Sequence, residues 1–252
     1  MSIMKSDYGV LVVGDVHVAQ NQDVSRADLL GKVIKELKPK KVVFIGDFMT
    51  FDSFSNWDKD KRKLMEGRRY SLEIEKGNEF LDRMYRKAGS SLPECVFVEG
   101  NHEDRVSRYL DYKPELSGTV NYIKDLSLEG WEFVPYKDYT YIQGIGYTHI
   151  PISEAGKPIG GKYVAHRALE LHQGSTIFGH THKLSTASLH RHGSPHLSQA
   201  LNVGCFFEHV DEYALGSVTS YWRGLVYIDH YKPGRFGWTP ISMGKLKKEY
   251  LK

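Results

Sequence analysis

Apolar positions in the first half of the chain follow two alternating patterns. Short apolar runs, typical of buried strands, lie at residues 10–13, 41–45 and 96–98. Between these runs, apolar residues recur at helical spacing over residues 27–37 and again over 71–88. Pro39 ends the first of these helices, because proline cannot continue a helical hydrogen-bond pattern. The alternation predicts strands that are connected by helices.

The second half of the chain is richer in strands. Strands are expected at residues 139–142, 145–149, 176–178, 184–189, 197–203 and 217–228, and a helix at 162–172. The basic tail, residues 245–252, is expected to be solvated. Helices early and hairpins later predict an α/β fold in which two sheets pack together with helices outside. We expect one domain over residues 1–252, with residues 48–70 inserted as a cap segment.

Composition limits the classes of protein that fit this pattern. Hydrophobic residues make up 40% and charged residues 26% of the chain, which excludes a mostly disordered protein. The sequence has no apolar run long enough to cross a membrane, and its N-terminal apolar stretch is too short for a secretory signal. Two cysteines cannot form a disulfide framework, so we expect reduced thiols and a cytoplasmic protein. With 34 basic and 31 acidic residues the net charge is +3, which argues against a dedicated groove for polymeric nucleic acid.

Side chains that can bind metal ions follow the ends of several apolar runs, most of them close after a glycine. They are Asp15, His17, Asp47, Asn101, His149, His180 and His182. Glycine permits a sharp turn at a strand end, and ligand sites of α/β proteins gather at the carboxyl edge of the sheet. Seven donors exceed the four of a tetrahedral zinc site and suit two ions that share a carboxylate. Carboxylate, imidazole and amide donors favour manganese, with iron, zinc, nickel, cobalt or magnesium as alternatives.

Each of these motifs has a simpler explanation when it is taken alone. Gly-Asp after a strand is commonly a turn, Asn101 is a suitable N-cap for a helix, and His-x-His occurs on surface strands. Turn chemistry does not explain five such motifs that each follow an apolar run. We therefore expect them to form one site.

The order of the motifs carries a family resemblance. Asp-x-His, Gly-Asp, Gly-Asn-His-Glu, His and Gly-His-x-His, over about residues 10–204, resemble the signature of the calcineurin-like metallophosphoesterase family. The run Gly-Asn-His-Glu-Asp-Arg at 100–105 is similar to bacteriophage-type members. The resemblance implies a sandwich of two mixed β-sheets flanked by helices (αββα), with two metal ions at one edge. It implies one ion held by Asp15, His17 and His182, another held by Asn101, His149 and His180, and a bridge made by Asp47.

The resemblance also implies that His102 acts beside the substrate, as a proton donor or a phosphate-binding group. Phosphatases with the pattern Gly-Asp-x-x-Asp use the later aspartate to orient that histidine. This chain has Thr50 at the equivalent position, and the nearest acid is Asp52. The partner of His102 is therefore open at this point.

The implied reaction is the hydrolysis of a phosphate ester, with Asp47 and His102 as the catalytic residues. Two divalent ions acidify a shared water, so that a metal-bridging hydroxide attacks phosphorus in line. We expect a phosphomonoesterase whose small partner is a (deoxy)nucleoside monophosphate, in the cytoplasm of the host if the chain is phage-encoded. The alternatives are a phosphodiesterase or nuclease on the same site and, in another class, a metal-free binding scaffold. The pattern indicates no membrane partner and fixes no oligomeric state.

Candidate substrate contacts are Trp57, Arg68, Arg69, Arg105, Arg108 and Lys162. The cap segment interleaves aromatic and basic residues, which suits a base and its phosphate, or it forms a solvated helix whose aromatics pack on the sandwich. Arg105 suits a phosphoryl oxygen, or it pairs with an acid such as Glu103. Lys162 ends a run similar to a P-loop, but Tyr163 stands where that motif needs Ser or Thr, which excludes an ATPase.

Overall fold

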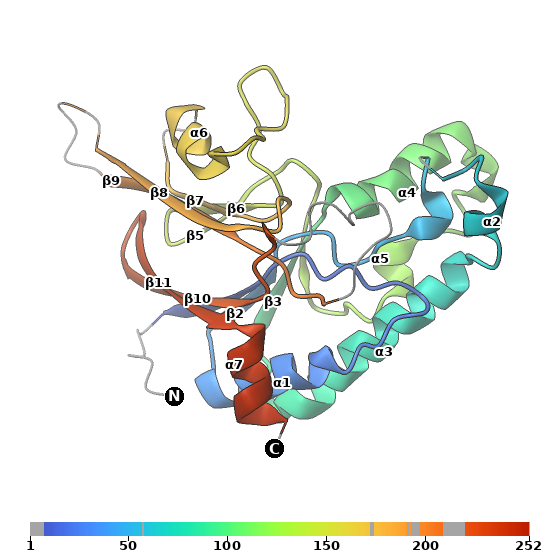
Figure 1. Ribbon diagram of the computed structural model, residues 1–252, viewed down its shortest axis with the longest axis horizontal. Helices are drawn as coiled ribbons and strands as arrows, with labels where there is room; N and C mark the ends of the chain where they lie inside the picture. The colour runs from blue at the N-terminus through green and yellow to red at the C-terminus, as the bar shows by residue number, and fades with distance from the viewer. Residues whose placement is uncertain are drawn as a thin grey trace.

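Two β-sheets lie face to face in this protein, and helices cover both outer faces (Figure 1). The computed structural model describes residues 8–56, 58–171, 174–190, 192, 197–208 and 220–251. Helices α1, α3 and α7 lie below the first sheet in Figure 1, and α6 lies above the second. No helix within these ranges has the length and apolar character that a membrane crossing requires.

The first sheet has six strands in the order β11-β10-β1-β2-β3-β4. The strands are β1 (Gly9–Val13), β2 (Lys41–Phe44), β3 (Glu94–Val98), β4 (Glu132–Val134), β10 (Gly224–Lys232) and β11 (Arg235–Ser242). Strands β1 to β4 run parallel, while β10 pairs antiparallel with both β1 and β11. The parallel part places the carboxyl ends of β1, β2 and β3 at one edge.

The second sheet has five strands in the order β5-β6-β7-β9-β8. They are β5 (Thr140–Ile142), β6 (Ile145–Thr148), β7 (Thr176–Phe178), β8 (Leu184–His190) and β9 (Leu197–Val203). Strands β6, β7 and β9 run parallel, and the antiparallel strands β5 and β8 form the edges. The expected hairpin between β5 and β6 is present, and both turn residues, Gln143 and Gly144, have positive φ.

The helices cover the sheets and form one end of the molecule. They are α1 (Arg26–Leu37), α2 (Arg62–Met65), α3 (Tyr70–Ala88), α4 (Asn101–Tyr112), α5 (Tyr122–Asp125), α6 (Val164–Leu171) and α7 (Met243–Tyr250), with 3-10 turns η1 (Asp52–Phe54), η2 (Gly89–Ser91) and η3 (Pro114–Leu116). Helices α1 and α3 pack against each other. Helices α2, α4 and α5 gather at the right-hand end of the view in Figure 1.

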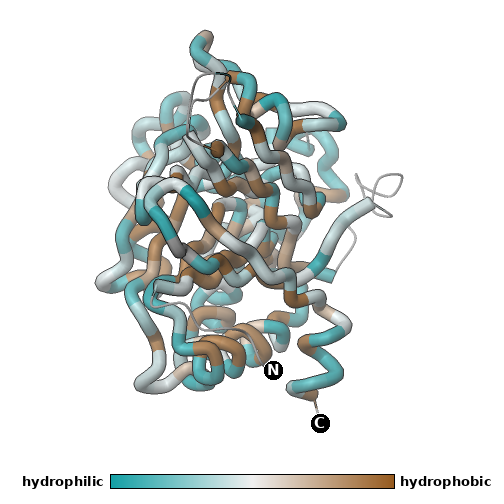
Figure 2. The backbone as a smooth tube through the Cα atoms, turned by 90° about the vertical axis from the view of Figure 1, so that its left-hand side faces the viewer, coloured by the Kyte–Doolittle hydropathy of each residue, from teal (hydrophilic) through white to brown (hydrophobic). Residues whose placement is uncertain are grey.

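The inner strands β1, β2 and β3 of the first sheet are apolar on both faces because both faces are buried. In β1, Val10 and Val12 point between the two sheets, whereas Leu11 and Val13 point toward the helices. A smaller cluster joins α6 to the outer face of the second sheet. Apolar segments accordingly lie inside the molecule and polar segments outside (Figure 2). The predicted αββα sandwich is confirmed.

One element contradicts the prediction. The C-terminal tail is not simply solvated, because residues 243–250 form α7. Met243 and Leu246 lie three residues apart on one face of this helix, and Leu246 is fully buried in the core below the first sheet. The Lys32 side chain also donates a hydrogen bond of 2.6 Å to the backbone carbonyl of Tyr250. The lysines in this segment concealed its apolar face. The expected strand at 217–228 lies partly outside the described residues, and its described part belongs to β10.

Candidate metal centre

Loops at the carboxyl ends of five strands carry the seven predicted metal ligands. Asp15 and His17 follow β1, Asp47 follows β2, Asn101 begins α4 after β3, His149 follows β6, and His180 and His182 follow β7. Parallel strands place their carboxyl ends at one edge of a sheet. The topology therefore brings together side chains as far apart in the chain as His17 and His182.

The backbone at this edge departs from ordinary conformations. His17, Asp47, His180 and His182 all have positive φ, between 47° and 69°. Residues other than glycine seldom adopt this left-handed region, and such outliers concentrate at functional sites. Four of the seven predicted ligands are thus held in strained conformations.

The glycines before the ligands are needed mainly because a Cβ atom at these positions would clash with a neighbouring loop. Only Gly46 has positive φ (106°), whereas Gly14, Gly100 and Gly179 lie outside the left-handed region. A Cβ atom on Gly179 would lie 2.5 Å from Asp15 Oδ1, and one on Gly100 would lie 2.2 Å from the Asp47 nitrogen. The expectation that glycine avoids a Cβ clash at these strand ends holds for all four, whereas a left-handed backbone is needed at Gly46 alone among them. They let neighbouring ligand loops approach each other closely.

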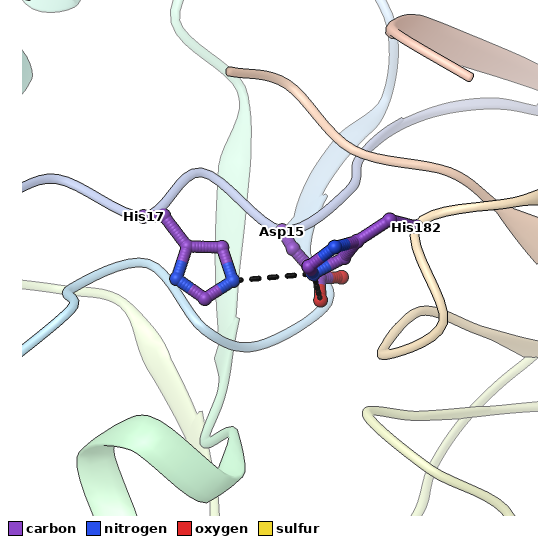
Figure 3. Close-up of side chains that lie close together, drawn as sticks. All are labelled: Asp15, His17 and His182. Atoms are coloured by element: carbon purple, nitrogen blue, oxygen red, sulfur yellow. Dashed lines mark hydrogen bonds and ion pairs between the residues drawn. The ribbon is translucent and has the colours of Figure 1, made fainter. Parts of the chain in front are cut away.

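Asp15, His17 and His182 form the first ligand group, and their side chains point toward one another (Figure 3). His17 Nε2 lies 3.2 Å from His182 Nε2, which lies 3.0 Å from Asp15 Oδ2. Asp15 Oδ1 accepts a hydrogen bond from the His180 backbone N–H. The approach of His182 to Oδ2 lacks hydrogen-bond geometry, so this buried oxygen has no hydrogen-bond donor among the described residues.

The second ligand group centres on His149 Nε2. This atom lies 3.0 Å from Asn101 Oδ1, 3.2 Å from His180 Nδ1 and 3.3 Å from Asp47 Oδ2. The other ring nitrogen of His149, Nδ1, donates a hydrogen bond to the Ile45 carbonyl, so Nε2 carries a lone pair in the neutral ring. A nitrogen lone pair directed at two oxygen atoms needs a cation or a proton between them.

Asp47 lies between the two ligand groups. Its Oδ1 accepts a hydrogen bond from the His102 backbone N–H, which fixes the carboxylate. Its Oδ2 lies 3.8 Å from His17 Nε2 and 3.3 Å from His149 Nε2, one histidine from each group. This is the arrangement that a carboxylate shared by two ions requires.

The chemistry of the donors fits divalent metal ions. Burial disfavours a charged imidazole, yet the Asp47 carboxylate outweighs it and raises the pKa of His149 to about 9. Burial likewise opposes ionisation of Asp47, but His149 and His102 hold the pKa of this carboxyl well below its usual range. The buried cluster therefore attracts positive charge strongly. Four imidazoles, two carboxylates and an amide are suitable ligands for borderline or hard divalent ions.

His102 lies beside both groups, and its partner is a backbone atom. Its Nδ1 donates a hydrogen bond of 2.9 Å to the Thr50 carbonyl, so the main chain of Thr50, not the Asp52 carboxylate, orients the ring. The His102 and His17 rings pack edge to face with centroids 4.5 Å apart. Burial lowers the pKa of His102 to about 4, although the Asp47 carboxylate opposes the shift.

Two residues that were not predicted to belong to the site hold the ligand loops in place. The buried Glu103 carboxylate accepts hydrogen bonds from the backbone N–H groups of Asp47, Met49 and Gly100. Glu103 thereby joins the loop after β2 to the start of α4, whose N-cap is Gly100 instead of Asn101. The sequence feature that indicates this role is a glutamate three residues after the N-cap, which is the position of a capping box.

Arg26 is the second of these supporting residues. Its guanidinium donates hydrogen bonds to the backbone carbonyls of Val16, Asp23 and Phe206. These bonds hold the loop that contains Asp15 and His17 against the chain after β9. Burial lowers the pKa of Arg26 to about 10, so the side chain stays charged at neutral pH. A lone arginine at the start of a helix gave no sequence signal for this role.

The candidate substrate contacts lie in three places. Arg105 donates a hydrogen bond of 3.1 Å to the same Thr50 carbonyl that accepts from His102, which places it beside the metal ligands. Arg108 pairs with Asp104 at 2.8 Å, and Arg68 pairs with Asp58 at 3.3 Å in the cap segment. Arg69 is exposed beside Arg68, and Lys162 is exposed before α6 with its ammonium 5.4 Å from the centre of the Tyr163 ring. Trp57 lies outside the described residues.

Two aromatic residues of the cap segment belong to the core. Phe51 packs against Tyr70 and Tyr122, and Phe54 packs against Tyr70 and Tyr109. Both phenylalanines are buried. Of the two interpretations of these aromatics, packing on the sandwich holds for Phe51 and Phe54, and neither ring is placed to stack on a base.

Comparison with solved structures finds proteins of low sequence identity that are similar along most of this chain. Vps29 from Chaetomium thermophilum has 10% identity and a TM-score of 0.43, with 93% of this chain and 97% of that chain covered. A dimetal phosphatase from Danio rerio has 12% identity and a TM-score of 0.42, with 94% and 99% covered. The purple acid phosphatase PPD1 from yellow lupin seeds has 10% identity and a TM-score of 0.42, with 93% and 51% covered.

Comparison at the level of sequence gives two results. No curated protein matches the chain. The family model described as calcineurin-like phosphoesterase matches residues 8–184, well over half of the sequence. That range begins before β1 and ends at the first residue of β8, so it includes every loop that carries a predicted ligand. The chain belongs to the calcineurin-like phosphoesterase family.

Proposed function

We propose that this chain is a metal-dependent phosphoric ester hydrolase that removes the phosphate from nucleoside monophosphates. Family membership supports phosphoester hydrolysis with a centre of two divalent metal ions. The observation that carries the proposal is the position of Asp47 Oδ2, 3.8 Å and 3.3 Å from one histidine nitrogen of each ligand group. A carboxylate in this position would bind two cations, which would activate water and neutralise the phosphoryl oxygens.

The ligand groups define how the ions would be held. Asp15, His17 and His182 would hold one ion, and Asn101, His149 and His180 would hold the other. Asp47 would bind both. When bound, the ions supply acidified water and neutralise the phosphoryl oxygens. Manganese is the metal that we propose, because the set mixes imidazole with hard oxygen donors and contains no thiolate.

His102 and Arg105 would act on the substrate itself. The Thr50 carbonyl holds the proton of His102 at Nδ1, which leaves Nε2 to interact with the ester or the leaving group. A negatively charged phosphate close to this ring favours its protonated form, which can then donate a proton to the departing alkoxide. The Arg105 guanidinium shares the Thr50 carbonyl and keeps further N–H groups for a phosphoryl oxygen.

A substrate panel tests the proposal. The metal-free protein is reconstituted with Mn²⁺ and given p-nitrophenyl phosphate, bis-p-nitrophenyl phosphate, nucleoside monophosphates and single-stranded DNA. We expect turnover of the monoesters and little turnover of the diesters. Hydrolysis of diesters alone would refute the phosphomonoesterase assignment, and failure to bind Mn²⁺ would refute the metal centre.

A further inference from the structure

Twelve residues of the cap segment carry an excess of positive charge. Residues 58–69, which we call the basic ridge, contain six of the 34 basic residues and three of the 31 acidic residues. Outside the ridge, 28 basic and 28 acidic residues balance each other. The modest overall charge of +3 is therefore compatible with local positive regions, and the ridge is one of them.

Most of the positive charge on this ridge is open to solvent. The exposed basic residues are Lys59, Lys61, Arg62, Lys63 and Arg69. Asp58 pairs with Lys61 and with the half-buried Arg68. Lys59, Arg62 and Lys63 form no ion pair within the described part of the chain. These three charges are available to a ligand.

A hydrogen-bonded contact ties the ridge to the metal centre. The Gln20 side chain donates to the Gly67 carbonyl and accepts from the Arg69 backbone N–H, both at 3.0 Å. Gln20 lies three residues after His17, so their Cα atoms are at most about 11 Å apart. In Figure 1 helix α2, which carries Arg62 and Lys63, lies at the right-hand edge of the view, on the same side as α4, whose first residue is the predicted ligand Asn101. The ridge therefore borders the loop that holds the first ligand group.

We propose that the basic ridge binds the phosphate backbone of single-stranded nucleic acid whose terminal phosphate enters the metal centre. This inference rests on the proposed phosphomonoesterase function and extends its substrate from a nucleoside monophosphate to the terminal nucleotide of a strand. A nucleic acid strand supplies both an ester for the centre and a row of negative charges for the lysines and arginines.

Burial of the ligands favours a single strand over a duplex. His17 and His149 are fully buried, and Asp47 is 2% exposed. A phosphate within a duplex is held on a stiff helix and reaches such atoms less easily. A flexible single strand delivers its end to them at little cost.

Binding of an oligonucleotide without turnover tests the ridge. The probe is an oligothymidylate of about ten nucleotides with a 5′ phosphate and a 3′ fluorophore, measured by anisotropy in EDTA. The ridge variant is Lys59→Gln/Arg62→Gln/Lys63→Gln. The matched control is Lys35→Gln/Lys245→Gln/Lys248→Gln, which removes three exposed lysines from α1 and α7.

The salt dependence of binding gives the readout. Removal of three phosphate contacts is expected to reduce the slope of log affinity against log salt by about 2, and the control should keep the slope of the unmodified protein. Thermal unfolding and Mn²⁺ content of the ridge variant should match those of the control, which separates loss of binding from loss of fold. Equal slopes in the two variants, or equally tight binding of a duplex of the same length, would overturn the inference.

Failure of the ridge and failure of the proposed function give different results. Salt-dependent binding through the ridge without hydrolysis of any phosphate ester would leave the ridge standing and refute the enzyme. If the protein hydrolyses nucleoside monophosphates but binds the oligonucleotide independently of the ridge, the enzyme stands and the ridge is refuted. Cleavage inside the strand would leave the ridge in place and overturn the terminal phosphate as the target.

Discussion

A single added methyl group at Gly46 tests whether close packing of the ligand loops creates the metal centre. A Cβ on this residue would lie 2.3 Å from His149 Nδ1 and 2.6 Å from His149 Cγ. Non-bonded carbon contacts are ordinarily about 3.5 Å or longer. The Gly46→Ala variant therefore has to move the His149 ring by about 1 Å, which disturbs the hydrogen bond from Nδ1 to the Ile45 carbonyl.

Two costs add in this variant. Gly46 has φ of 106°, and a left-handed conformation costs an alanine about 1–2 kcal/mol. Overpacking of the kind that the His149 contact imposes adds about 1–3 kcal/mol. The free energy of unfolding should thus fall by about 2–5 kcal/mol in metal-free protein. Displacing the support of a metal-binding histidine should weaken the affinity of its site by about 10–100-fold.

Gly130→Ala is the matched control. Gly130 has φ of 78°, but no atom lies within 4 Å of the position where its Cβ would stand. In Gly130→Ala the free energy of unfolding should fall only by the cost of the left-handed conformation, and both metal sites should be kept. Urea unfolding in EDTA measures stability, and Mn²⁺ titration followed by metal analysis measures affinity. If Gly46→Ala matches Gly130→Ala in both measurements, close packing against His149 does not support the centre.

Three further perturbations address the bridge, the proton donor and a buried acid. Asp47→Asn should lower turnover by more than about 100-fold and reduce the bound Mn²⁺ measured by metal analysis; full retention of both ions would contradict a shared carboxylate. His102→Ala should keep its metal, and its rate on a nucleotide should fall by about 10²–10⁴-fold. Its rate on p-nitrophenyl phosphate should fall much less, because p-nitrophenolate leaves without a proton. Equal losses on the two substrates would contradict proton donation. Burial raises the pKa of Glu73 from 4.5 to about 7 despite hydrogen bonds from Ser53. Between these two pH values the folded protein therefore keeps a proton on Glu73 that the unfolded chain has lost. Stability in EDTA should fall with rising pH across this window by up to about 3 kcal/mol, and Glu73→Gln should abolish this dependence in urea unfolding at pH 5 and pH 8; an unchanged slope would show that Glu73 is not its source.

Strands whose two faces are both buried were predictable because each is a continuous apolar run. This holds for β1, β2 and β3, each of which has a neighbouring strand on both sides in the six-stranded sheet. The edge strand β11 gave no such signal, since it contains Gly237 and Pro240 and buries few side chains. The three-residue strand β4 is too short to form a pattern. These elements are defined by backbone pairing with a neighbour, which no local pattern of side chains records.

The candidate ligands were predictable for a different reason. A metal ligand must be one of a few residue types, and strand ends are few, so Asp15 or His149 is conspicuous after an apolar run. The groups that orient the site are not conspicuous. The partner of His102 is the backbone carbonyl of Thr50, and Glu103 binds three backbone N–H groups. Every residue has such backbone atoms, so only the fold can show which of them a side chain meets.

The failure of local rules at the ligands is itself informative. Propensity alone assigns His17, Asp47, His180 and His182 to ordinary negative φ, and all four adopt positive values instead. Such conformations cost about 1–3 kcal/mol each and persist only where the surroundings fix them. The backbone hydrogen bonds of Glu103 and Arg26 provide that fixation for the loops after β2 and β1. A fold selected for stability alone has no reason to retain four strained residues at one edge. Their convergence on Asp47 therefore supports a functional centre independently of the residue types that form it.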